Sequence, residues 1–85
     1  MTVKLRKGIA VTTTEYGGVL LDEKDGSYWQ LNDTSIIVVE TLAAGQAPEA
    51  AVERIVAEFD VERAEAEADV AQLTQQLVEA KILRP

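Results

Sequence analysis

The residues of this sequence that could do chemistry are carboxylates, because it contains no cysteine and no histidine. The missing thiols and imidazoles exclude disulfides, thiolate nucleophiles, the usual zinc sites and every Ser-His-Asp arrangement. Most of the 15 aspartates and glutamates lie along the predicted helical half of the chain, and they are not paired between apolar segments, as an acid/base pair would be. We therefore predict no catalytic residue, no metal ligand and no cofactor, and we expect a protein that is not an enzyme.

The charge balance argues against nucleic acid as a partner. The formal net charge is −7, whereas nucleic-acid binding draws most of its affinity from Lys and Arg side chains that neutralise phosphates. The basic residues are scattered, and only Lys4, Arg6 and Lys7 lie close together. A short basic segment of this kind is typical of a solvated chain end, so we expect no nucleic-acid partner.

Length and hydropathy bound the organisation of the chain. Its 85 residues are enough for one domain, residues 1–85, and not for two. No run approaches the roughly 18 apolar residues that a membrane span needs. The charged segment Met1 to Lys7 is not followed by the apolar region of a signal peptide. We expect a cytoplasmic protein with no membrane partner.

Three strands are predicted in the first half of the chain. They cover residues 9–14, 19–21 and 27–31, and a strand before them, around residues 3–5, is a further option. We interpret Gly17 and Gly18 as punctuation between the first two strands. Asp25-Gly26 is a strong hairpin signal between the second and the third.

Three helices are predicted in the second half. Their apolar positions at helical spacing are Ile36, Val39, Leu42 and Ala43 in the first, Ala51, Val52, Ile55, Val56 and Phe59 in the second, and Val70, Leu73, Leu77 and Val78 in the third. Asn32 or Asp33 can cap the first helix, and Gly45 can end it. Pro48 suits the first turn of the second helix, and Asp60 can cap the third.

Strands followed by helices indicate an α+β domain of winged helix-turn-helix type, with a three-stranded antiparallel sheet followed by three helices. Three strands cannot close into a barrel, so in chain order the third strand is an edge with free N–H and C=O groups. Residues 27–31 carry neither charge nor proline, which usually protect such an edge. The unprotected edge predicts that an extended peptide adds to it as a further strand.

The residues of the third strand also have structural roles that compete with peptide binding. Trp29 and Leu31 share one strand face, and we expect them to point toward the helices as part of the core. Tyr28 and Gln30 then point the other way, where a tyrosine is often only half-buried.

The third helix has a competing structural role as well. Val70, Leu73 and Leu77 are first of all its core seam. Contact with a peptide would then fall to residues at the margin of that seam, such as Asp69 and Thr74. The charged positions of the second and third helices are expected to form a solvated face.

An ordered set of residues runs through nearly the whole chain. It comprises Leu21-Asp22 through Gly26, Tyr28-Trp29-Gln30-Leu31-Asn32, Thr34, Leu42 and Gly45, and then Pro48 through Phe59, Val61, Asp69-Val70 to Leu77-Val78-Glu79-Ala80 and Ile82-Leu83. This set resembles the PqqD-like proteins, small leader-binding proteins of peptide modification that are also called RiPP recognition elements. It is most similar to the stand-alone leader-binding proteins of lasso-peptide biosynthesis. Lys81 stands where family members often carry Gly, so the third helix is expected to run on past it.

The resemblance implies a leader peptide lying antiparallel to the third strand, in a groove between that strand and the third helix. Carried onto this sequence, the peptide-binding residues are Ser27, Tyr28, Trp29, Gln30 and Leu31 on the strand, and Asp69, Val70, Leu73, Thr74 and Leu77 on the helix. In lasso pathways such a protein is an adaptor for a leader peptidase, which is a cysteine protease, and for an ATP-dependent cyclase. Those enzymes and the leader peptide are the implied partners, and the adaptor raises the effective concentration of precursor at the protease.

Three other functions remain open on the sequence. The protein could bind leader peptides in another pathway, such as that of a quinone cofactor or a radical-enzyme peptide, and neighbouring genes would discriminate. A winged-helix DNA-binding regulator has the same fold, but its third helix would bring the negative charges of Glu62, Glu65, Glu67 and Asp69 to the phosphates. An acyl or peptidyl carrier protein needs a serine in an Asp-Ser-Leu-type context, which Asp33-Thr34-Ser35-Ile36 matches only faintly.

Overall fold

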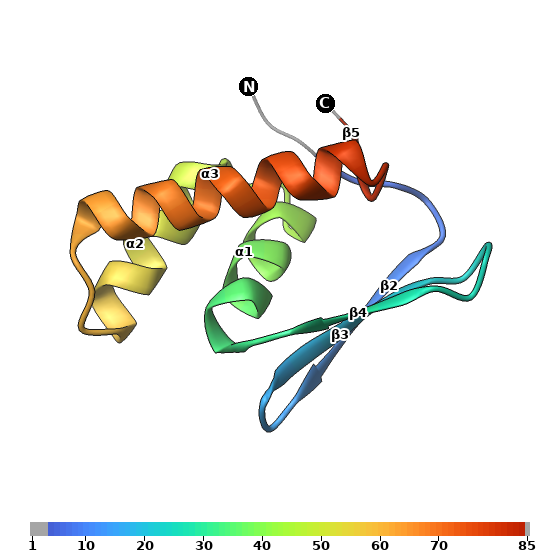
Figure 1. Ribbon diagram of the computed structural model, residues 1–85, viewed down its shortest axis with the longest axis horizontal. Coiled ribbons are helices and arrows are strands. Elements are labelled where there is room, and N and C mark those ends of the chain that lie inside the picture. Colours follow the sequence, from blue (N-terminus) through green and yellow to red (C-terminus); the bar gives the residue numbers. More distant parts are fainter. Residues whose placement is uncertain (1–3, 85) are drawn as a thin grey trace.

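A computed structural model describes residues 4–84 of the chain. In order, the elements are β1 (Lys4–Leu5), β2 (Ile9–Thr14), β3 (Gly17–Asp22), β4 (Tyr28–Leu31), α1 (Asp33–Ala43), α2 (Pro48–Glu58), α3 (Arg63–Glu79) and β5 (Leu83–Arg84). Strands β2, β3 and β4 form an antiparallel sheet in chain order, and β1 pairs with β5. The helices lie on one side of the three-stranded sheet (Figure 1). The predicted α+β fold, with a three-stranded antiparallel sheet and three helices, is confirmed.

The two glycines interpreted as punctuation lie inside strand β3, so that interpretation is wrong. A Cβ atom at Gly17 would collide with the carbonyl oxygen of Leu31. A Cβ atom at Gly18 would come within 2.5 Å of the Ile36 side chain. The glycines are therefore there because β4 and α1 approach this part of β3 closely. The turn between β2 and β3 is formed by the two preceding residues, 15 and 16.

Strand β4 begins at Tyr28, one residue later than predicted. Ser27 belongs to the preceding turn, where its main-chain N–H and its hydroxyl both donate to the Asp25 carboxylate, at 2.9 and 2.6 Å. The optional early strand is present as β1, although Val3 lies outside the described residues.

The first two helices start where local signals predict, and α1 also stops there, whereas Phe59, predicted within the second helix, follows the end of α2 in an extended conformation. Asn32 caps α1, because its side-chain oxygen accepts a hydrogen bond of 2.8 Å from the Ser35 N–H. Gly45 follows the end of α1 with a φ of +83°, and Pro48 opens α2. The predicted cap at Asp60 is wrong: α3 starts later, and Glu62 occupies the cap position without a side-chain hydrogen bond. Val61, between the two, packs against the core.

The third helix ends at Glu79, so the expectation that it runs on past Lys81 is wrong. Lys81 takes the left-handed conformation, with a φ of +63°. The N–H of Ile82 donates to the Leu77 carbonyl at 2.9 Å, and that of Lys81 donates to Val78 at 3.0 Å. These bonds form a Schellman motif, which normally places glycine where Lys81 stands.

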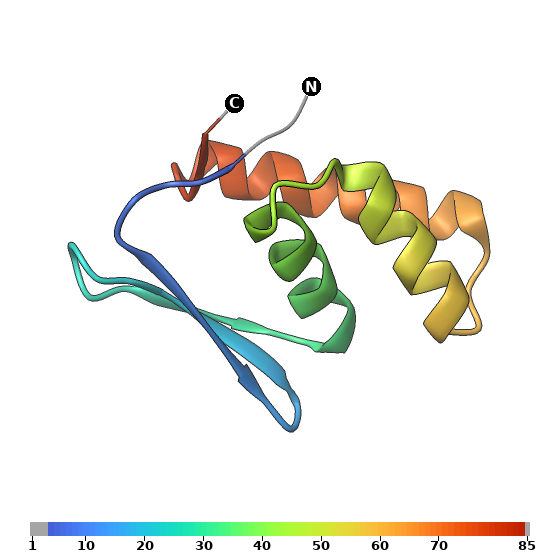
Figure 2. The ribbon, with the colours of Figure 1, turned by 180° about the vertical axis from the view of Figure 1, so that it is seen from behind.

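Helix α1 occupies the centre of the molecule, between the sheet and the other two helices (Figure 2). Its buried residues Val39 and Leu42 meet Leu20 from β3 and Leu77 from α3 in a core that excludes water completely. None of the helices among residues 4–84 is both long and apolar enough to cross a membrane. The core thus fixes α3 relative to the sheet, and with it the space between α3 and β4.

Candidate peptide-binding groove

Strand β4 is an edge of the sheet, and its register shows which main-chain groups are open. The Asp22 N–H donates to the Ser27 carbonyl at 2.8 Å, and the pairs that follow are Leu21 with Tyr28 and Leu20 with Trp29. Hydrogen-bonded and non-bonded pairs alternate along an antiparallel ladder. Trp29 therefore bonds to β3, whereas Tyr28 and Gln30 direct their N–H and C=O groups away from it. Within residues 4–84, no strand pairs with that side of β4.

The side chains of β4 alternate as the sequence predicts. Leu31 is buried and Trp29 packs against the core on the helix side of the sheet. Tyr28 is 69% exposed and Gln30 is exposed on the opposite face. The main-chain N–H and C=O groups of Tyr28 and Gln30 point along the plane of the sheet. They can therefore bond a peptide whichever face of the sheet the side chains occupy.

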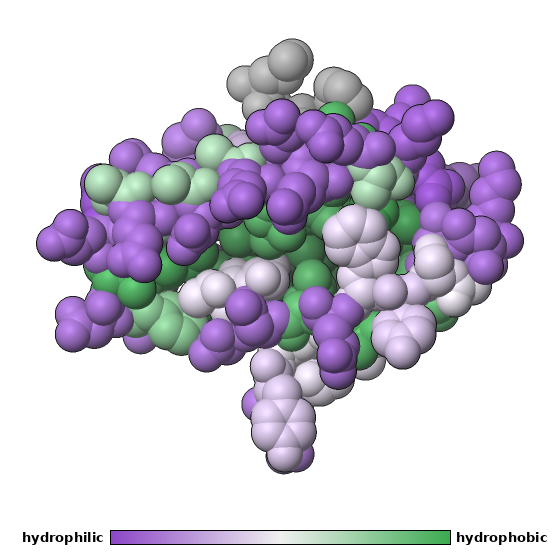
Figure 3. Space-filling model, in the orientation of Figure 1, coloured by the Kyte–Doolittle hydropathy of each residue, from purple (hydrophilic) through white to green (hydrophobic). Residues whose placement is uncertain are grey.

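A groove lies beside the end of β4, between the start of α1 and the flank of α3. Its volume is about 300 Å³, and it is lined by Asn32, Thr34, Ser35, Val38, Ile55, Val61, Ala66, Asp69, Val70 and Leu73. A more open hollow over the sheet, which Gln30 and Leu31 also line, shares Asn32 and Ser35 with this groove. In Figure 3, hydrophobic surface is recessed beneath the hydrophilic side chains of α3. The two hollows form a continuous surface that runs from the sheet to α3, which we call the β4–α3 groove.

The residues predicted on α3 divide between two sides of the helix. Asp69 and Leu73 line the β4–α3 groove, and buried Val70 forms part of its floor. Leu77 is fully buried and reaches no surface. Thr74 lines a different pocket, between α2 and α3. The structure thus brings Asp69, Val70 and Leu73 together beside β4 and places the other two elsewhere on the helix.

Sequence reasoning missed the part of the groove that comes from other elements. Asn32 and Ser35 form its junction with the sheet, and Val38, Ile55 and Val61 supply apolar surface. Asn32 was recognised only as a helix cap. Its exposed position directly after an edge strand is a signal that could have marked it as a groove residue.

The turn before β4 lowers the pKa of one carboxyl group. Hydrogen bonds from the Ser27 hydroxyl and then from its N–H lower the pKa of Asp25 below its usual 3.8. The carboxylate therefore stays ionised and holds the turn next to the first residue of β4. Among residues 4–84, no three acidic side chains gather closely enough to bind a metal ion.

The family model for "Coenzyme PQQ synthesis protein D (PqqD)" matches residues 17–83. The chain belongs to the PqqD family. The predicted resemblance to the PqqD-like RiPP recognition elements is thereby confirmed. A comparison with curated proteins gives no match.

Two solved structures share the fold of this PqqD-family chain over almost its full length. One is "Lasso peptide synthetase B1 complexed with the leader peptide", with a TM-score of 0.86 and 41% identity over 100% of both chains. The other is "TbiB1 in Complex with the TbiA(beta) Leader Peptide", with a TM-score of 0.84 and 26% identity over 95% of this chain and 94% of that one. Both related proteins were therefore captured with a leader peptide bound.

Proposed function

We propose that this protein binds the leader region of a ribosomally synthesised precursor peptide as an added antiparallel strand on β4. The observation that carries the proposal is the open main chain of Tyr28 and Gln30 beside an apolar groove. Main-chain hydrogen bonds would give affinity, and groove side chains would give specificity. The leader-bound structures of the 41% identical lasso peptide synthetase B1 and of TbiB1 support this ligand.

The other edge of the sheet is a weaker candidate for strand addition. Strand β2 exposes Thr12, Thr13 and Thr14 at its outer end, and of these only Thr14, its last residue, lines the hollow over the sheet. Beside β4, by contrast, Asn32 leads directly into the groove under α3. A peptide on β4 therefore buries side chains as well as bonding its main chain, which favours that edge.

The proposed contacts follow the predicted residues, with roles that depend on their positions. Tyr28 and Gln30 would bond the peptide through the main chain, and Ser27 would fix the turn where the strand begins. Trp29 and Leu31 would hold β4 on the core, and Asp69 and Leu73 would contact peptide side chains. Val70 would form the floor of the groove. Thr74 and Leu77 would hold α3 in place through contacts on its other sides.

The proposed role is that of an adaptor without catalytic activity, formed by residues 1–85 as one leader-peptide-binding domain. It would deliver the precursor to a leader peptidase, a cysteine protease, and to the cyclase of lasso-peptide biosynthesis. The similarity to the lasso peptide synthetase B1 favours that pathway over a quinone-cofactor or radical-enzyme pathway. The site of action would be the cytoplasm, where ribosomal precursors are made.

A titration monitored by NMR tests the binding mode. The leader peptide of the precursor encoded beside the protein should perturb the amide signals of residues 28–32 and of Asp69 and Leu73. The variant Gln30→Glu should weaken binding, because it adds a charge beside the paired edge of an already acidic protein. If the leader bound while these signals stayed unchanged, the β4 docking mode would be wrong.

The winged helix-turn-helix description belongs to the proposal as well, with α2 and α3 as the helix pair and the sheet as the wing. DNA binding is the second function that such an arrangement raises. The exposed side chains of α3 include Glu65, Glu67 and Asp69, which would repel phosphates. Binding to DNA with a steep dependence on salt would favour this alternative over peptide binding.

A further inference from the structure

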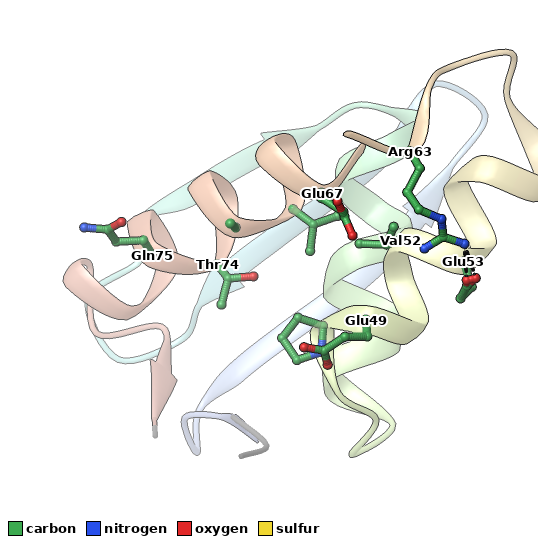
Figure 4. A pocket seen from close by; sticks show the side chains of 10 residues that line it. Glu49, Val52, Glu53, Arg63, Glu67, Thr74 and Gln75 are labelled. Carbon is green, nitrogen blue, oxygen red and sulfur yellow. Dashed lines mark hydrogen bonds and ion pairs between the residues drawn. The ribbon is translucent and has the colours of Figure 1, made fainter. Parts of the chain in front are cut away.

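A second pocket lies on the side of α3 that faces away from β4, between α2 and α3. We call it the α2–α3 pocket; its volume is about 510 Å³, and Pro48, Glu49, Val52, Glu53, Arg63, Glu67, Val70, Ala71, Thr74 and Gln75 line it (Figure 4). The volume lies in the range of pockets that hold sizeable ligand groups. The peptide groove described above does not use this pocket, so its occupant must be something else.

The floor of the α2–α3 pocket is apolar. Val52 from α2 and Val70 from α3 are both buried, and Ala71 adds a small side chain at the rim. Pro48 begins α2 at one end of the pocket. This space is open on one side and lined by valine, alanine and proline. An apolar side chain that displaces water from it is therefore stabilised by the burial of apolar surface.

The rim of the α2–α3 pocket is acidic. Glu49, Glu53 and Glu67 border it, against the single cation Arg63. Arg63 is already engaged, because it donates to both carboxylate oxygens of Glu53 at 2.5 Å, which raises its pKa. Glu49 and Glu67 project from the two helices toward the space between them (Figure 4). Their charges favour an occupant that carries lysine or arginine next to its apolar group.

The wall of the pocket also contains an unsatisfied polar atom. The hydroxyl oxygen of Thr74 is buried, and it has no hydrogen-bond partner within the described chain. Figure 4 shows this side chain extending from α3 toward α2. Buried hydroxyls are normally satisfied, so a main-chain carbonyl beside the apolar side chain of an occupant would complete the wall by accepting from the Thr74 hydroxyl.

We propose that the α2–α3 pocket docks the partner enzyme, by accepting an apolar side chain flanked by lysine or arginine from a surface segment of the leader peptidase. The inference rests on the proposed adaptor function. An adaptor must hold peptide and enzyme at once, and the two sites occupy different sides of α3. Asp69 and Leu73 face the groove, whereas Glu67 and Ala71 face the pocket.

Buried Val70 contributes to the floor of both sites. A side chain seated in the pocket therefore packs against the same residue that supports the bound leader from the other side. Peptide and enzyme would then form a ternary complex across one helix without competing for surface. This arrangement accounts for an acidic pocket that strand addition leaves unused.

Three substitutions on α3 test the inference. Ala71→Trp fills the pocket from an exposed rim position, and Glu67→Lys reverses the charge at the rim. Glu65→Lys is the matched control, because it makes the same charge change at an exposed position that lines neither site. Circular dichroism and thermal melting establish that each variant folds.

The affinity for the purified leader peptidase encoded beside the protein is measured by biolayer interferometry, without leader. Affinity for a fluorescent leader peptide is measured separately by anisotropy. Ala71→Trp and Glu67→Lys should weaken peptidase binding by at least about tenfold, as for central contacts of an interface. Glu65→Lys should stay within about twofold, and leader affinity should change little in all three variants.

Several outcomes overturn the docking inference. Peptidase binding that is absent in the wild type, or equal in the wild type and both pocket variants, removes the proposed occupant. Sedimentation showing a wild-type dimer that Ala71→Trp dissociates assigns the pocket to a second copy of the chain. If the wild type does not bind the leader peptide, the proposed function is wrong. The peptidase measurement still tests separately whether the α2–α3 pocket docks the enzyme.

Discussion

Proline and alanine at Gln30 separate the contribution of a main-chain donor from that of the side chain. The register of β3 and β4 directs the Gln30 N–H away from the sheet, so proline there removes no hydrogen bond of the free protein. Edge strands tolerate proline for this reason. Gln30→Ala removes the exposed side chain and keeps the N–H group. Any loss of leader affinity beyond that of Gln30→Ala then measures the missing donor.

The size of that loss follows from the geometry of strand addition. Removing only the donor leaves a peptide carbonyl buried and unpaired, which costs about 1–3 kcal/mol. A difference of roughly 1–3 kcal/mol between the two variants corresponds to a ratio of dissociation constants of about 5 to 150. Gln30→Ala alone should weaken binding by no more than about threefold, because the exposed side chain lines only the open hollow over the sheet and not the space under α3.

Fluorescence anisotropy with a labelled leader peptide provides the dissociation constants, and thermal melting reports whether proline changes the stability of the free protein. Equal affinities of Gln30→Pro and Gln30→Ala, with both variants folded, would refute strand addition at this register. A large loss of stability in Gln30→Pro would show instead that its N–H bonds within the sheet.

Three further predictions concern stability and ionisation. Lys81→Gly should raise stability by about 0.5–1 kcal/mol, since glycine adopts the left-handed conformation of residue 81 without strain; denaturant unfolding measures the gain, and an unchanged or lower midpoint contradicts it. Gly18→Ala should cost about 1–3 kcal/mol in the same assay, because its Cβ has no room next to α1; a neutral effect would mean that α1 moves freely. Ser27→Ala should raise the pKa of Asp25 toward 3.8, as measured by NMR titration of the carboxyl signal. The stability that this lowered pKa contributes is present above pH 3.8 and is lost as the pH falls through the pKa of the folded state. An unchanged pKa of Asp25 in Ser27→Ala would contradict the hydrogen bond from the Ser27 hydroxyl.

Local signals in the sequence predict the elements of this fold well. Strand β2 has the predicted bounds, Asn32 caps α1, and Pro48 starts α2. Each of these depends on contacts between residues a few positions apart. Two features that these signals do not show involve partners that are distant in sequence: Gly18 of β3 packs against Ile36 of α1, and β5, which was not predicted, pairs with β1 at the other end of the chain.

Lys81 shows how local and distant contacts together override the conformational preference of one residue. Its positive φ is unfavourable for lysine, yet the two Schellman hydrogen bonds close the helix there. The guanidinium of Arg6 also bonds the Lys81 carbonyl at 2.6 Å and pairs with the carboxylate of Asp22. The end of α3 is thus tied to both β3 and the N-terminal segment, which no pattern within the helix could predict.

For the candidate site, the sequence predicted which strand and which helix form the groove, but not which side of that helix faces the strand. The apolar stripe of α3 has no feature that tells which side meets β4 and which meets α2. That division depends on where α2 packs, and it separates Leu73 from Thr74 although they are neighbours in sequence. Residues that α1 and the α2–α3 connection contribute, such as Val38 and Val61, come from segments that the strand pattern does not mark.

Affinity and specificity for a leader peptide must come from different parts of the groove. The donors and acceptors of Tyr28 and Gln30 are main-chain groups, which pair with any extended peptide. Discrimination therefore falls to the hollow of about 300 Å³ under α3, with Val38, Val61 and Leu73 in its walls. Such a space accepts apolar side chains and excludes acidic ones, which would lose their water beside the Asp69 carboxylate. Substitutions in that hollow should change which leader is bound, whereas substitutions that affect the β4 main chain should weaken all leaders alike.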